Sequence, residues 1–198
     1  MAAAPRQGDL FNQAAAGASD QQAAALTLTA DQLRSWQERV HRAQAPLFEA
    51  KAQVDSQGSL FGAVSAPAED IQPLSLNPLP LSFWRWPESP HQGAALYWVM
   101  DRPDHLDLPI LLYLGETKAA DRRWKGEHDC KAYLAAYGEA LQRCGLPHQL
   151  SIRFCTDVPR STKARRALEQ RLIQRWLPPF NKETRQRWAT PFQAESRS

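Results

Sequence analysis

The sequence has few cysteines, few glycines and no long apolar run. Its three cysteines, Cys130, Cys144 and Cys155, are odd in number and show no CxxC spacing, which argues against a disulfide framework or a thiolate zinc site. The longest strongly apolar stretch, residues 108–114, is far shorter than the roughly 20 residues that cross a bilayer. The first residues also lack the apolar core of a secretory signal. We therefore expect a soluble, cytoplasmic protein with no membrane partner.

Charge is divided unevenly along the chain. Residues 1–112 carry 7 basic and 12 acidic residues, whereas residues 113–198 carry 17 and 9. Nine of the basic residues lie between positions 160 and 187, and Arg165 and Arg166 are among them. Counterion release makes a polyphosphate such as DNA a natural partner of a basic surface. The alternative is an ordinary solvated helix face.

The first third of the chain predicts one helix beside disordered segments. Residues 1–27 hold almost no large apolar side chains and predict a disordered arm. Within residues 28–61, Thr29 and Gln32 are spaced as a capping box at the start of an amphipathic helix, which we expect to end at Pro46.

The remaining chain predicts a linker followed by a small α+β domain. Residues 62–92 are rich in proline and predict an extended linker whose end is anchored by Phe83, Trp84 and Trp86. Residues 93–190 predict the domain, and residues 191–198 a tail. Its expected strands are 95–100, 110–114 and 149–155, and its expected helices are 118–128, 131–143 and 162–176.

Several polar residues are spaced as a site. Alternation along the predicted hairpin places Tyr97, Leu111 and Tyr113 on one face and Leu112 on the other. Gly115 at the strand end leaves room for close approach of a substrate or another backbone. Glu169 falls on the apolar stripe of the last helix and needs a partner, which can be an arginine or a divalent cation.

Five ordered motifs resemble those of the GIY-YIG nucleases. They are Ala95-Leu96-Tyr97, Tyr113-Leu114-Gly115, Arg123-Trp124, Glu169 and Asn181, and the resemblance covers about residues 94–188. Ala95 stands where the first family motif usually has glycine. The resemblance implies a three-stranded antiparallel sheet flanked by helices and an endonuclease that hydrolyses phosphodiester bonds.

The resemblance also implies roles for individual residues. Glu169 would hold Mg²⁺ or Mn²⁺ with water and phosphate oxygens as further ligands. Arg123 would clamp the scissile phosphate. Tyr97 would orient or deprotonate the attacking water, and Tyr113 would hydrogen-bond that water or the phosphate.

Three further kinds of residue complete the expected site. Asn181 would fix the chain beside the catalytic residues, and His128 is an alternative base to Tyr97 because its pKa lies near neutrality. Lys118, Lys125, Arg165 and Arg166 are candidate phosphate contacts, with generic surface positions as the alternative for the lysines.

A pentapeptide pattern, Gln-x-x-Leu-Phe, occurs three times in the N-terminal third. The copies are residues 7–11, 44–48 and 57–61. The first and third copies resemble the peptide by which bacterial repair and replication proteins bind the DNA sliding clamp. That resemblance assigns clamp binding to six residues, with local packing as the alternative: Gln7, Leu10, Phe11, Gln57, Leu60 and Phe61. In the second copy, Leu47 and Phe48 can instead continue the docking of the helix.

We therefore expect a divalent-metal-dependent DNA endonuclease of repair or recombination, associated with the nucleoid and tethered to the sliding clamp. A non-catalytic DNA-binding or clamp adapter is one alternative. A restriction-like or mobile-element endonuclease is another, although no zinc finger or helix-turn-helix is evident to read a sequence.

Overall fold

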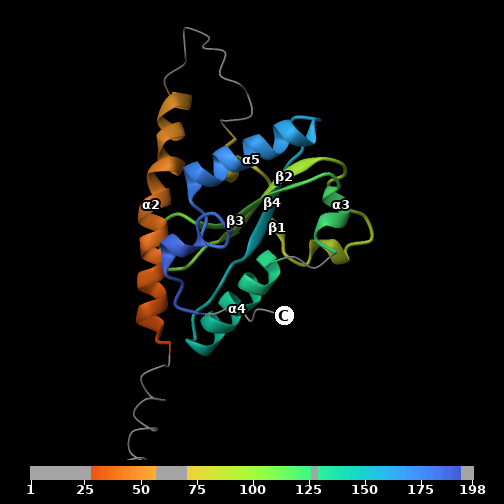
Figure 1. Ribbon diagram of the computed structural model, residues 1–198. Coiled ribbons are helices and arrows are strands. Elements are labelled where there is room, and N and C mark those ends of the chain that lie inside the picture. Colours follow the sequence, from red (N-terminus) through yellow and green to blue (C-terminus); the bar gives the residue numbers. More distant parts are fainter. Residues whose placement is uncertain (1–27, 57–70, 126–128, 193–198) are drawn as a thin grey trace, which may run out of the picture.

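Four antiparallel strands form one sheet at the centre of the fold (Figure 1), and the computed structural model describes residues 28–56, 71–125 and 129–192. The strand order is β1-β4-β2-β3, so β2 lies between β4 and β3. The strands are β1 (Leu79–Pro80), β2 (Ala95–Asp101), β3 (Ile110–Thr117) and β4 (Ser151–Cys155). The expected α+β class is confirmed, but the sheet has a fourth strand, β1, that we did not predict from the sequence.

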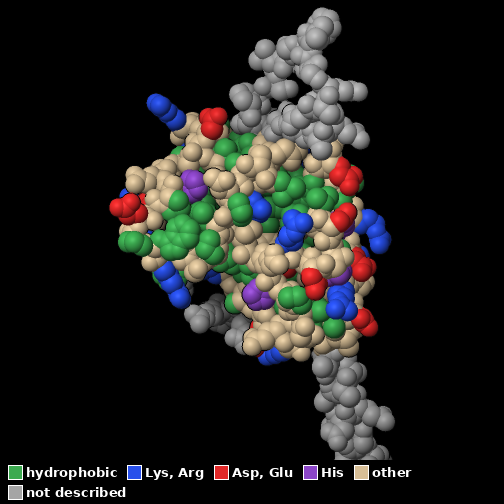
Figure 2. Space-filling view, turned by 180° about the vertical axis from the view of Figure 1, so that it is seen from behind, with side chains coloured by type: hydrophobic (Ala, Val, Ile, Leu, Met, Phe, Trp, Pro, Cys, Tyr) green, Lys and Arg blue, Asp and Glu red, His purple; other side chains and the backbone are tan. Residues whose placement is uncertain are grey.

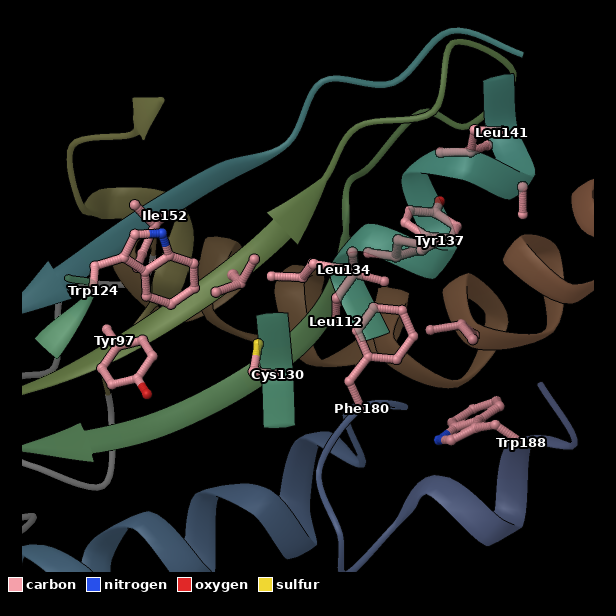
Figure 3. Packing of buried hydrophobic residues seen from close by; sticks show 14 of the residues in the cluster. Tyr97, Leu112, Trp124, Cys130, Leu134, Tyr137, Leu141, Ile152, Phe180 and Trp188 are labelled. Carbon is pink, nitrogen blue, oxygen red and sulfur yellow. The ribbon is translucent and has the colours of Figure 1, made fainter. Parts of the chain in front are cut away.

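Helices cover both faces of the sheet (Figure 1). The helices are α2 (Ala30–Ser56), α3 (Ala120–Arg123), α4 (Asp129–Arg143) and α5 (Thr162–Trp176). One apolar cluster joins α4 and the first half of α2 to one face of β2, through residues such as Tyr97, Leu134 and Tyr137 (Figure 3). A second cluster joins α5 to the opposite face, where Leu96 and Trp98 lie. The two layers leave β2 completely buried, which explains its continuous apolar sequence.

A β-bulge changes the faces of two residues on β3. The pairing of β2 with β3 shifts between Val99 and Met100, where Val99 pairs with Tyr113 and Met100 with Leu111. The extra residue, Leu112, therefore lies in the cluster with Tyr97, and Leu111 lies in the cluster with α5. The faces expected for Leu111 and Leu112 were thus wrong, because a bulge interrupts the alternation on which they rested.

Helix α2 begins as predicted but continues past its proline. Thr29 and Gln32 exchange hydrogen bonds of 3.0 and 3.2 Å, which confirms the capping box. The helix runs through Pro46 to Ser56, so the expected end at Pro46 was wrong. Pro46 is exposed, and side chains beyond it still pack on the domain, with Phe48 6% exposed. None of the helices within the described residues is long and apolar enough to cross a membrane.

The outer edge of β3 is paired by side chains instead of a further strand. The Gln44 amide accepts from the Leu111 N–H at 2.7 Å and donates to the Leu111 carbonyl at 3.0 Å. The Asn181 amide pairs with both backbone groups of Leu114 in the same way, at 3.0 and 2.8 Å. The Phe180 N–H donates to the Leu112 carbonyl at 2.9 Å. These bonds satisfy an edge that would otherwise be open to another strand.

Residues 71–92 fold onto the domain, so the described part of the expected linker is not an extended connection. Leu79 in β1 pairs with Ile152 in β4. Phe83 is 2% exposed and its ring lies 5.4 Å from that of Phe154. Phe83 therefore anchors this segment as expected, whereas Trp84 and Trp86 are 38% and 44% exposed and do not. The rest of the expected linker and the expected disordered arm, residues 1–27, lie outside the described residues.

Candidate functional site

Two phenols face each other from adjacent strands, as the sequence predicted. Tyr97 on β2 is fully buried, Tyr113 on β3 is partly exposed, and their ring centroids are 5.9 Å apart. Tyr97 pairs with Gly115 across the strands. A Cβ atom on Gly115 would lie 2.5 Å from the Tyr97 hydroxyl oxygen, so glycine is needed for the phenol to occupy this position.

Arg123 joins these phenols from the last residue of α3. Its Nε donates to the Tyr97 hydroxyl at 3.1 Å, and its guanidinium carbon lies 6.0 Å from the centre of the Tyr97 ring. The next residue, Trp124, is buried and packs edge-on against Tyr97 at 6.0 Å. The Arg123-Trp124 pair therefore holds a partly exposed cation against Tyr97 with an aromatic ring as its anchor.

Both phenols are held in their neutral form near pH 7. Burial raises the pKa of Tyr113 to about 12, and burial followed by the nearby Tyr113 raises the pKa of Tyr97 well above its ordinary value. The Arg123 cation opposes both shifts without reversing them. A neutral phenol hydrogen-bonds and orients a water molecule well but is a poor proton acceptor. This environment favours Tyr97 as an orienting group over Tyr97 as the base.

Glu169 on α5 reaches the same end of the hairpin. Its carboxylate Oε1 accepts from the backbone N–H of Glu116 at 2.9 Å, so α5 is fastened to the end of β3. The side chain is half-buried, and desolvation raises its pKa to about 7, with the Glu116 and Glu183 carboxylates adding to the shift. Arg123 lowers the pKa of Glu169 and that of Tyr113, which places these groups within one electrostatic neighbourhood.

The arginine that could have paired with Glu169 binds a different carboxylate. Arg165 is 1% exposed, and its Nε donates to Glu116 at 2.8 Å while its Nη1 donates to the carbonyls of Pro159 and Arg160. The part of the chain that the structure describes contains no salt bridge to Glu169. The sequence suggested an arginine or a divalent cation as the partner of Glu169. Among the described residues, no arginine binds it directly.

Glu169 fits a cation that is held by one carboxylate and otherwise by water. The carboxylate is half-buried and forms no salt bridge with any of the described residues, and a divalent cation would supply a compensating charge. Mg²⁺ keeps several waters and is commonly bound through one or two carboxylates. Within the described residues, no group of three acidic, histidine or cysteine side chains is placed to hold a metal, so a cage built wholly of protein ligands is not present there.

Asn181 contacts the backbone of β3 next to the site. The residue is 3% exposed, and its amide accepts one hydrogen bond from and donates one to the backbone of Leu114, the residue between Tyr113 and Gly115. Asn181 therefore fixes the chain after α5 against the outer edge of β3.

The candidate phosphate contacts differ in their access to solvent. Lys118 and Lys125 are exposed, and Arg166 is 67% exposed with its Nε 3.3 Å from Glu116. Arg165 is 1% exposed and engaged in the bonds described above, so it presents no charge at the surface for a DNA phosphate. Its role is to orient Glu116, and through that residue the backbone N–H that binds Glu169.

Glu116 is the site residue that the sequence analysis missed. It follows Gly115 at the strand end, and both its backbone N–H and its carboxylate bond α5, through Glu169 and through Arg165 and Arg166. The structure does not describe His128 or the six expected clamp-binding residues, which are Gln7, Leu10, Phe11, Gln57, Leu60 and Phe61.

Comparison of the chain with protein-family models, curated proteins and solved structures finds no match in any of the three.

Proposed function

We propose that this chain is a divalent-metal-dependent endonuclease that hydrolyses phosphodiester bonds of DNA during repair or recombination. The observation that carries the proposal is the grouping of Glu169, Arg123 and two neutral phenols at one end of the β2–β3 hairpin. Within the described residues this carboxylate has no salt-bridge partner, and with Arg123 nearby it suits a site that a cation and a phosphate share. The excess of basic residues in the C-terminal half supports an anionic polymer as substrate.

Arg123 would bind the scissile phosphate. Its guanidinium is permanently charged and presents parallel N–H groups that match two phosphate oxygens. Its bond to Tyr97 fixes one edge of the guanidinium and restricts its orientation. The cation would thereby offset the negative charge that develops on the phosphate in the transition state.

Tyr97 and Tyr113 would position the attacking water. The water oxygen bonds to phosphorus as the bond from phosphorus to the 3′-oxygen breaks, the water gives up a proton, and the 3′-oxygen gains one. A bound Mg²⁺ or Mn²⁺ would supply Lewis-acid stabilisation of the leaving oxygen. Glu169 would hold that cation through the carboxylate whose other bond goes to Glu116. The elevated pKa values of the phenols leave His128 as the candidate base.

A cleavage assay on three DNA forms tests the proposal. Branched, flapped and plain duplex DNA are incubated with Mg²⁺ or Mn²⁺ and wild-type protein, Glu169→Gln or the matched control Glu139→Gln, which alters an exposed carboxylate on α4. We expect wild type and the control to cut at equal rates and Glu169→Gln to cut at least about 100-fold more slowly.

Other outcomes would identify the alternatives. Absence of cleavage of every DNA by wild type, combined with binding that Glu169→Gln leaves unchanged, would contradict the proposal and favour a DNA-binding adapter. Cleavage of plain duplex at one fixed sequence would favour a restriction-like or mobile-element enzyme. A second variant, Arg123→Lys, keeps the positive charge but loses the paired N–H groups of the guanidinium. We expect its cleavage rate to be about tenfold to 100-fold lower than that of wild type.

A further inference from the structure

Two tryptophans lie exposed on the segment that precedes β2. Within the described residues, the exposed large apolar side chains are Leu74, Trp84 and Trp86. Trp84 and Trp86 belong to one short turn, the 3₁₀ helix η2 (Phe83–Arg85) and the residue after it. In Figure 2, a broad apolar patch lies on the side of the molecule where Figure 1 shows α3 and the segment before β2. Large aromatic rings left in contact with water commonly mark a binding surface.

The turn that carries the tryptophans is firmly held. Phe83, between Ser82 and Trp84, is buried and packs edge-on against Phe154. Backbone bonds of 2.9 and 3.0 Å close the turn, from Arg85 to Ser82 and from Trp86 to Phe83. A platform that is already ordered loses little conformational freedom when a ligand binds, which favours a recognition role over an incidental exposure.

This platform is connected to the catalytic residues by ring contacts. Phe154 lies between the two, with its ring 5.4 Å from Phe83 and 5.8 Å from Tyr97. On the other side, the N–H of Ala120, the first residue of α3, donates to the Gly93 carbonyl at 2.8 Å and joins the segment to the helix that carries Arg123. The turn that carries the tryptophans and the helix that carries Arg123 are therefore both attached to the core around Tyr97.

The charge beside the rings indicates the kind of ligand. The Arg85 guanidinium stacks on Trp84, with its central carbon 5.1 Å from the ring centre. Helix α3 contributes Arg122, whose side chain is 81% exposed and whose Nε lies 3.4 Å from the Asp121 carboxylate. Aromatic faces interleaved with arginine match a nucleic-acid strand, which offers flat bases and anionic phosphates together.

We propose that Trp84 and Trp86 form a stacking platform for unpaired nucleobases next to the cleavage site. This inference rests on the proposed function and narrows it to DNA that contains a single-stranded part. Bases inside a duplex are stacked on one another and present their faces to no side chain, so only a frayed, flapped or single-stranded segment can use the rings. Arg85 and the arginines of α3 bind the phosphates of that segment.

Binding measured without catalysis tests the platform. Fluorescence anisotropy with full-length protein in EDTA compares a labelled 20-nucleotide oligothymidine with a labelled hairpin duplex. The variants are Trp84→Ala, Trp86→Ala, the double variant and the matched control Leu74→Ala, another exposed apolar side chain. We expect each tryptophan variant to bind the oligothymidine about tenfold more weakly and the double variant more weakly still. Duplex affinity and the Leu74→Ala values should stay within about twofold of wild type.

Two readouts separate a binding effect from a folding effect. Because each tryptophan is still partly buried, thermal unfolding must first show that every variant is folded at the temperature of the binding assay. Trp86→Phe, which retains a ring, should recover part of the lost affinity. Equal weakening of single-strand and duplex binding, or unchanged single-strand binding in the double variant, would overturn the platform.

The two proposals fail in different ways. Wild-type protein that binds oligothymidine through the tryptophans but cuts no DNA would leave the platform standing and remove the nuclease. Protein that cuts flapped DNA at the same rate with and without both tryptophans, and binds it equally well, would leave the nuclease standing and remove the platform. Binding of neither DNA would overturn the platform and make a protein partner the better account of the exposed rings.

Discussion

Gly115 and Tyr97 face each other across the β2–β3 pair so closely that a Cβ atom on Gly115 would lie 2.5 Å from the Tyr97 hydroxyl oxygen. The same Cβ would lie 2.9 Å from the Tyr113 ring. Tyr97 is fully buried and packs against Trp124 and Phe154, so its ring cannot move away without displacing other aromatic side chains. The glycine therefore sets the position of the phenol that contacts Arg123.

Gly115→Ala should damage both the site and the fold. The added methyl group displaces the Tyr97 hydroxyl and its bond to Arg123, so we expect at least about a tenfold loss in cleavage rate. Overpacking should also lower the free energy of unfolding by about 1–3 kcal/mol. Steady-state cleavage and urea unfolding measure the two effects.

Gly138→Ala is the control for that change. A Cβ atom on Gly138 in α4 would meet no atom within 4 Å, so alanine should raise the free energy of unfolding by about 0.5–1 kcal/mol through its helix propensity and leave the cleavage rate unchanged. Equal activity of Gly115→Ala and wild type would contradict the assignment of Tyr97 to the site.

Glu169 should make the stability of the protein fall as pH rises. Its pKa of about 7 in the folded protein exceeds the ordinary value of 4.5, so the folded state binds the proton more tightly than the unfolded state. Stability from this group is present at low pH and is lost as pH rises from about 4.5 to about 7. Glu169→Gln removes the effect and should melt a few degrees above wild type at pH 8 in EDTA, with a smaller difference at pH 5.

Added Mg²⁺ should raise the melting temperature of wild type but not that of Glu169→Gln. A cation bound to the ionised Glu169 carboxylate stabilises the folded state, so 10 mM Mg²⁺ should raise the melting temperature of wild type at pH 8, raise it less at pH 5, and leave Glu169→Gln unchanged. An equal Mg²⁺ response in both proteins at pH 8 would remove Glu169 as the metal ligand.

Gln44 should contribute more to stability than its polar character suggests. Its amide bonds both backbone groups of Leu111 and the carbonyl of Trp176, so Gln44→Ala leaves three buried polar groups without a partner. We expect the free energy of unfolding to fall by about 2–4 kcal/mol. Denaturant unfolding tests this against Glu38→Ala, an exposed position on the same helix. A loss below about 0.5 kcal/mol would show that water replaces the amide easily.

Local patterns predicted the parts of the fold that depend on neighbours in sequence. The capping box at Thr29 and the buried stripe of α2 follow from spacings of three or four residues. The shared face of Tyr97 and Tyr113 follows from the alternation of side chains along each strand of the hairpin. The bulge at Leu112 could not be read in this way, because a run of consecutive apolar residues fits both faces of a sheet equally well.

Features that depend on distant partners were the ones missed. Pro46 was expected to end α2, but the docking of Gln44 and Phe48 on either side of it outweighs the lost backbone bond. Arg165 carried the charge expected of a DNA contact, and only the fold brings Glu116 against it. Leu79 and Pro80 form a strand because β4 offers an open edge, which their own sequence does not indicate.

The middle Gln-x-x-Leu-Phe copy shows how this pattern can engage an apolar surface. Gln44 bonds the edge of β3, and the Phe48 ring lies 4.6 Å from that of Trp176. This copy is occupied within the chain, so we propose that only the first and third copies bind the sliding clamp. Each contributes a Leu-Phe pair for an apolar pocket and a Gln for a hydrogen bond at its edge.

Replacing Leu10, Phe11, Leu60 and Phe61 together by alanine should abolish co-elution with the clamp in size-exclusion chromatography. Each pair alone should weaken co-elution partly, since two tethered sites bind with avidity. Cleavage of short DNA should stay at the wild-type rate, and Asn12→Ala with Gln13→Ala, beside the first copy, should co-elute normally. Phe48→Ala should lower stability and leave clamp binding of the folded protein intact. Unchanged co-elution of the fourfold variant would remove the tether and leave local packing as the role of these residues.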